Sequence, residues 1–326
     1  MSKFTFRSDF WLSDYIYKIG NFNTQYIQTA FNTEGYYDFY NINTDQLLNN
    51  NTVTKLRKSG SKEVGSTTKK DKYEFVLIPN LGFLASPKQL IKNCELKIRF
   101  NRAKSSVALL RCKAGTESYQ ELEITDCYAQ STYISSDSLK SYFDGIDTSP
   151  ITYEYDDVEI ILKSLPTGET NIRFDNVRGG IVPSYIFVGI VSTNALKGSL
   201  TESSTRFARY NVDELDIKMN GNSVNGYPIS VNNGSAAYPL YQFQNSIERN
   251  YNSACGSSLK IEEFEYNWIW AHKFEAEDTH GWISLNVNLD TAYASNEKRT
   301  MVIWLITPST LSIDRFHQID KNNNSI

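Results

Sequence analysis

The stretch YIFVGIVSTNALKGSL, residues 185–200, decides the fold. Its first seven residues are almost all apolar, and their β-branched and aromatic side chains favour a buried strand. Small and polar residues follow from Ser192, which predicts a loop at the end of that strand. The run is far shorter than the roughly 20 apolar residues of a membrane helix, so it indicates the core of a globular β-protein.

A second informative stretch, NVDELDIKMNGNSV, occupies residues 211–224. Its side chains alternate between apolar and charged, which is typical of a half-buried strand, and Asn220 with Gly221 predicts a tight turn at its end. The order of buried strand, loop, amphipathic strand and tight turn suits a β-sandwich that builds surfaces and suits an enzyme poorly. The alternating residues are Leu215, Asp216, Ile217, Lys218 and Met219.

Short strands recur along the chain. The clearest is CELKIRF, residues 94–100, and in residues 282–289 the apolar side chains again share one face. Further strands are expected over residues 73–78, 107–110, 121–129, 158–162, 171–174, 265–270 and 301–306, with helices over 135–143 and 239–249. The pattern predicts an all-β fold, a sandwich or jelly roll with short helices in loops.

The 326 residues are too many for one typical sandwich and favour two β-domains. The polar break KAGTES, residues 113–118, places the boundary, so we expect one unit over residues 1–113 and a second over 114–326. The net charge of −4 gives no global basic field, which disfavours duplex binding by the whole surface.

Residues 49–72 form a local exception to this charge balance, because basic side chains are interleaved there with Gly and Ser. The composition predicts a flexible basic loop. This segment is either a solvent-exposed surface loop or a charged segment that contacts nucleic acid or an acidic neighbour. The candidate nucleic-acid-facing residues are Lys55, Arg57, Lys58, Lys62, Lys69, Lys70 and Lys72.

Specific catalytic motifs are missing from the sequence, including phosphate-binding loops and the zinc motif H-E-x-x-H. Carboxylates cluster in three places, which is typical of solvated strand faces; a glycosidase pair or a calcium site is the alternative. We therefore predict that the chain is not an enzyme and has no catalytic residue, cofactor or metal. The clusters are Glu154, Asp156, Asp157 and Glu159; Glu262, Glu263 and Glu265; and Glu275, Glu277 and Asp278.

Aromatic and histidine residues near the C-terminus allow two interpretations. Trp268 and Trp270 share a strand face, and with Trp282 they either fill a core or stack on a sugar. His272 and His280 lie eight residues apart, either as a metal or carbohydrate platform or as loop histidines beside core tryptophans.

Targeting and redox signals are also weak. The N-terminus lacks the apolar region of a signal peptide, and no apolar run could span a membrane, so we expect a protein that is made inside a cell and is not secreted. The four cysteines have no zinc spacing, which predicts free buried thiols, with a disulfide as the alternative; they are Cys94, Cys112, Cys127 and Cys255.

From about residue 74 onward the chain resembles the major capsid proteins of Polinton (Maverick) elements and adintoviruses, with a shortened N-terminal part. The resemblance rests on residues 82–110, 187–199 and 208–221, and on the ending QIDKNNNSI, residues 318–326. It implies a double jelly roll, which is two tandem antiparallel β-sandwiches, with the shortened first roll in residues 1–113 and the second in 114–326.

The resemblance further implies a virion structural protein that assembles into trimeric capsomers of an icosahedral shell. Expected partners are copies of itself, other capsid proteins such as a penton, and packaged DNA held without sequence specificity by the basic loop. Assembly would take place in the host cytoplasm or nucleus. The alternatives are a β-sandwich carbohydrate-binding or attachment protein that uses its tryptophans, and a minor capsid or penton protein.

Overall fold

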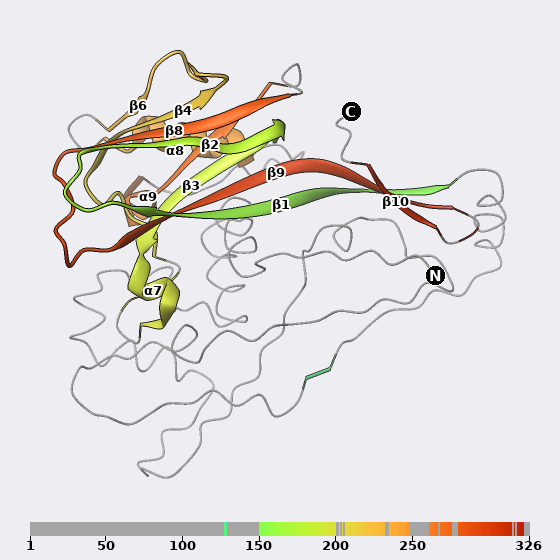
Figure 1. Ribbon diagram of the computed structural model, residues 1–326, viewed down its shortest axis with the longest axis horizontal. Helices are drawn as coiled ribbons and strands as arrows, with labels where there is room; N and C mark the ends of the chain where they lie inside the picture. Colours follow the sequence, from blue (N-terminus) through green and yellow to red (C-terminus); the bar gives the residue numbers. More distant parts are fainter. Residues whose placement is uncertain are drawn as a thin grey trace, which may run out of the picture.

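The computed structural model describes residues 127–128, 150–199, 202, 204, 206–231, 235–247, 261–266, 268–275, 280–314, 316 and 318–322 (Figure 1). Within these residues the chain forms two antiparallel sheets. The first contains, in spatial order, β1 (Ile151–Leu165), β9 (Arg299–Ile313), β3 (Tyr185–Ser192) and β7 (Ile269–Lys273), and β10 (Ile319–Asn322) also pairs with β9. The second contains β2 (Asn171–Ile181), β8 (His280–Leu289), β4 (Val212–Met219) and β5 (Asn222–Ser223), and β6 (Ile229–Ser230) also pairs with β4.

The strand order is that of a jelly roll. Each of β1 to β4 lies in the opposite sheet from the strand before it, and β7 to β9 alternate in the same way. Within each sheet, strands far apart in sequence become neighbours, β1 beside β9 and β2 beside β8. A jelly roll has this strand order because two Greek keys fold together into two packed sheets. The predicted all-β, antiparallel fold class is confirmed, and the sandwich described here lies in the predicted second unit; residues 1–113 lie outside the described residues.

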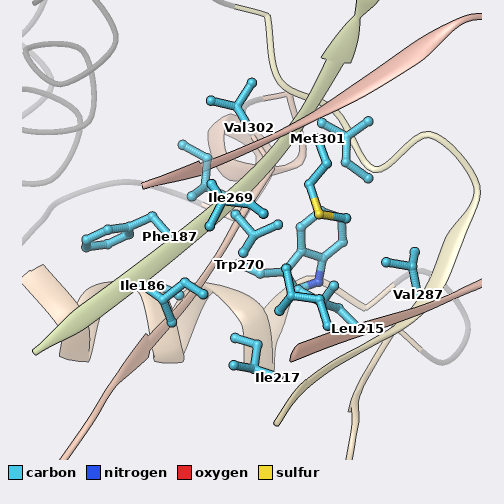
Figure 2. Close-up of a cluster of buried hydrophobic side chains, with 14 of the residues drawn as sticks. Ile186, Phe187, Leu215, Ile217, Ile269, Trp270, Val287, Met301 and Val302 are labelled. Carbon is cyan, nitrogen blue, oxygen red and sulfur yellow. The ribbon is translucent and has the colours of Figure 1, made fainter. Parts of the chain in front are cut away.

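The core fills the space between the sheets (Figure 2). On the second sheet, Leu215 and Ile217 of β4 are buried and alternate with polar neighbours, as the sequence predicts. On the first sheet, Trp270 of β7 and Met301 of β9 face them, and both side chains are fully buried. The inner residues of β8, all of them buried, complete this layer: Ile283, Leu285, Val287 and Leu289.

The opposite face of the first sheet is covered by helices and aromatic rings. Phe187 of β3 meets Phe243 of α8 (Ala237–Ile247) edge to face, with ring centroids 6.1 Å apart. Phe243 packs in turn on Phe264 of α9 (Ile261–Tyr266) at 5.7 Å. This second apolar layer explains why every residue of β3 is buried, on both faces of the sheet.

The structure confirms one local prediction from the sequence and corrects three others. The tight turn is confirmed, since Asn220 and Gly221 both have positive φ, 51° and 85°, as a two-residue hairpin of type I′ requires. The loop predicted after β3 is instead a short helix, α7 (Thr193–Gly198). The strand predicted from residue 265 begins only at Ile269, because α9 continues to Tyr266. Cys127, expected to be buried, is exposed.

The glycine inside β3 generates a stability prediction. A Cβ at Gly189 would lie 2.7 Å from Cδ1 of Phe207, whose ring is held against Trp304 at a centroid distance of 5.3 Å. We expect Gly189→Ala to lower the free energy of unfolding by about 1–3 kcal/mol through overpacking, measured by urea denaturation. In a Phe207→Leu background the same substitution should be less harmful; an equal loss in both backgrounds would contradict this explanation.

Candidate assembly surface

The basic loop predicted as a nucleic-acid contact lies outside the described residues, as do Cys94, Cys112, Cys255, Glu277 and Asp278. No described helix has both the length and the hydropathy that a bilayer span requires. The question of function therefore rests on the side chains of the sandwich itself.

Two of the three tryptophans considered for sugar binding are core residues. Trp268 and Trp270 are 2% and 0% exposed, and their rings are inclined by 55° rather than coplanar. Trp282 alone of the three is exposed, at 50%, on β8. The structure therefore supports the core interpretation for Trp268 and Trp270, and a stacked three-ring platform does not form.

The two histidines are also separated. His272 lies on β7 in the first sheet and packs edge to face on Phe274 at 5.0 Å, whereas His280 begins β8 in the second sheet and is exposed. Burial lowers the pKa of His272 to about 4, since desolvation disfavours the imidazolium. The ring is therefore neutral at physiological pH and acts as a packing residue.

The carboxylates of β1 do not converge. Asp156 and Asp157 are consecutive residues of one strand and point to opposite faces of the sheet. Glu159 forms an ion pair with Arg178 of β2, which ties the edges of the two sheets together. Among the residues that the structure describes, no group of three His, Cys, Asp or Glu side chains is placed to hold a metal ion.

A cluster of three tyrosines, called the tyrosine cluster below, is the most distinctive exposed feature. It joins Tyr227, from the connection between β5 and β6, to Tyr238 and Tyr241 of α8. The rings of Tyr227 and Tyr238 lie 6.1 Å apart, and the side chain of Gln242 donates a 2.8 Å hydrogen bond to the Tyr238 hydroxyl. Tyr227 is 59% exposed and Tyr241 55%, so large ring areas face solvent.

Helix α8 places these rings outward for a simple reason. Its apolar stripe, with Phe243 fully buried, packs against β7 and α9, and Tyr241 lies off that stripe. Desolvation and the neighbouring Tyr227 hydroxyl both raise the pKa of Tyr238, so the phenol stays uncharged. Neutral rings with a polar tip are the side chains most enriched where proteins bind one another. The arrangement can therefore form a protein contact, and sequence reasoning missed it because Tyr227 joins α8 only in the fold.

No protein-family model matches the chain, and no curated protein matches it. Solved structures similar to this chain include the following three. PBCV-1 VP54, fitted into a reconstruction of the virophage Sputnik, is 10% identical with a TM-score of 0.36, covering 58% of this chain and 55% of that chain. A chain of the Sputnik virophage is 10% identical with a TM-score of 0.33, covering 53% and 39%. The mavirus major capsid protein is 9% identical with a TM-score of 0.30, covering 53% and 41%.

The matched structures come from viral particles or their capsid proteins. The part of those chains that is matched ranges from 39% to 55% of their length. At TM-scores below 0.5, the fold of this chain is established by its own strand order rather than by these similarities.

The buried histidine generates a prediction about pH. The folded pKa of about 4 lies below the ordinary 6.5, so between these values the unfolded chain binds a proton at His272 that the folded chain does not. The free energy of unfolding should therefore fall as the pH falls from 6.5 to 4, by roughly 2 kcal/mol from this residue, because the ring is not fully buried.

Urea denaturation at pH 7 and pH 4.5 measures this loss. His272→Gln should remove part of the pH dependence, and His280→Gln, at an exposed position, should leave it unchanged. Equal pH dependence in the parent and the His272 variant would contradict the assignment.

Proposed function

We propose that this chain is a viral or virus-derived capsid protein that associates with copies of itself into trimeric capsomers of an icosahedral shell. The observation that carries the proposal is the jelly-roll strand order, joined to an exposed tyrosine cluster on the same sandwich. Jelly rolls recur in virus capsids, where the sandwich serves as a building block. A fold alone does not determine a function, so the proposal also depends on the exposed tyrosine cluster.

The tyrosine cluster suits contacts between identical copies. Each copy carries a formal charge of −4, so two copies repel one another weakly at long range, and a contact through uncharged groups adds no further repulsion. The three phenols are uncharged, amphipathic and partly held in place by their own contacts, which lowers the entropy lost when they bind. If the cluster meets a different patch on the next copy, the contact is heterologous and closes into a ring, as a trimer requires.

Further parts of the proposal follow the family resemblance. The chain would consist of two units, residues 1–113 and 114–326, in the manner of the Polinton and adintovirus capsid proteins. The basic residues of 49–72 would face packaged DNA and bind phosphate without reading sequence, so this contact would weaken as salt is raised. Penton proteins would be the other partners, and the virion the location. A minor capsid role would use the same contacts.

Oligomeric state is the first test. Size-exclusion chromatography with light scattering, at high micromolar concentration, should give a mass of three times the 37.2 kDa chain or a larger assembly. A strict monomer under these conditions would contradict the proposal. A monomer that binds immobilised glycans would instead favour the attachment alternative, with Trp282 as its exposed ring.

The surface itself is tested by Tyr241→Asp. The substitution replaces an exposed neutral ring by a negative charge at a contact between copies that are already negative, so we expect self-association to weaken by about tenfold or more. Analytical ultracentrifugation across a concentration series measures the constant. Trp282→Asp is the matched control, because it removes an equally exposed ring on β8, away from α8. Equal effects of the two variants, or none from Tyr241→Asp, would rule out the tyrosine cluster as the contact.

A further inference from the structure

The strands β1 and β9 run on past the sandwich as a ribbon (Figure 1). Residues 151–157 of β1 pair with residues 307–313 of β9, and β10 pairs with β9 along its other edge from Thr310 to Ile313. We call these three segments the distal ribbon. On that same edge, β3 ends its pairing with β9 at Ile306, so the ribbon begins where the sandwich stops.

One face of the distal ribbon is buried and carries four large apolar side chains, together with the small polar side chains of Thr307 and Ser309. Tyr153 is 1% exposed, Tyr155 7%, Leu311 3% and Ile313 2%, and the register places these side chains on the same face of the ribbon. The alternate residues point to the other face and are more accessible, Glu154 among them. Large apolar side chains that are almost inaccessible have other parts of the molecule packed against them.

The sandwich does not supply that layer. By strand alternation, the buried face of the ribbon continues the face of the first sheet that meets the second sheet. The strands of the second sheet end before the ribbon, however (Figure 1). Accordingly, none of the four buried ribbon residues belongs to the core cluster that the two sheets share.

We propose that the buried face of the distal ribbon is the docking surface for the N-terminal part of the same chain, through the apolar face of residues 73–110. The burial is present in a single copy of the chain, so a second copy is not needed to explain it. The described residues do not provide the cover, and the largest part of the chain outside them precedes β1.

Two features of the chain favour residues 73–110 within that part. Residues 94–100 alternate apolar and charged side chains, and this pattern predicts a strand whose apolar face, with Cys94, Leu96, Ile98 and Phe100, needs a partner layer. The chain also enters β1 at Ile151, which pairs with Ile313 at the far tip of the ribbon. Residues 111–149 then join the two parts and, at roughly 3.3 Å per extended residue, are long enough to reach any point on the ribbon.

The consequence is a shared core. The ribbon strands belong by hydrogen bonding to the described sandwich and by packing to the N-terminal part, so the two predicted units would not be independent domains. The inference does not depend on the proposed capsid role, since it concerns contacts within one chain.

Photo-crosslinking of the full chain tests the docking surface. Tyr153→p-benzoylphenylalanine places the reactive group on the buried face, and irradiation should link it to a peptide within residues 73–110 of the same chain. Mixing ¹⁵N-labelled and unlabelled protein distinguishes links within a copy from links between copies. Glu154→p-benzoylphenylalanine, on the opposite face, is the control and should not give that link. A link to another copy, or a link from position 153 to no residue in 73–110, would overturn the proposal.

Hydrogen exchange gives an independent measurement. In Leu311→Asp, a charge enters the buried face, and amides within residues 73–110 should exchange about tenfold faster or more. Peptides covering β3 should keep their protection, because the core between the sheets is not touched. Thr310→Asp, one residue away on the opposite face, should leave the exchange of 73–110 unchanged. Unchanged exchange of 73–110 in Leu311→Asp would count against the docking surface.

Discussion

The hydrogen-bonded ladder of β9 is the constraint on which the rest of the sandwich depends. This 15-residue strand pairs with β1 along its whole length on one edge, and with β3 and then β10 on the other. Its central residues are buried on both faces, Met301 toward the second sheet and Trp304 toward Phe207. The pairings of β9 with β1 and β3 join segments more than 100 residues apart, so the sandwich closes through long-range contacts, whereas the pairing with β10 is local.

Burial decides the role of the tryptophans. Among the described residues, the indole N–H groups of Trp268, Trp270 and Trp304 find no hydrogen-bond partner, and an unpaired buried N–H costs about 1–3 kcal/mol. Burying an indole of roughly 200 Å² is worth about 5 kcal/mol at 25 cal/mol per Å², so the hydrophobic gain exceeds that cost. The same rings on a protein surface would lose this gain. The balance explains why Trp268 and Trp270, for which the sequence also allowed a role in sugar stacking, belong to the core.

Alternation along the chain made much of the sandwich predictable, and its failures have physical causes. In β3, β4 and β8, the order of apolar and polar residues in the sequence predicts which side chains are buried. In the outer half of β9 the sequence does not predict burial, because Thr, Ser and Pro308 interrupt the apolar pattern. Pro308 is tolerated because it falls between the last partner of β3, Ile306, and the first partner of β10, Thr310. The tyrosine cluster was beyond prediction, since its members meet only after α8 docks.

The exposure of a tyrosine side chain indicates whether it stabilises a single copy of the chain or can contact a partner. Tyr153 is 1% exposed on the distal ribbon, whereas Tyr227 is 59% exposed beside α8. A side chain that one copy already buries stabilises that copy, and replacing it affects folding before it affects assembly. A ring that one copy leaves in solvent can release its hydration water only to a partner. The proposed contact within the chain and the proposed contact between chains therefore lie on different surfaces of this sandwich, and substitutions can test each separately.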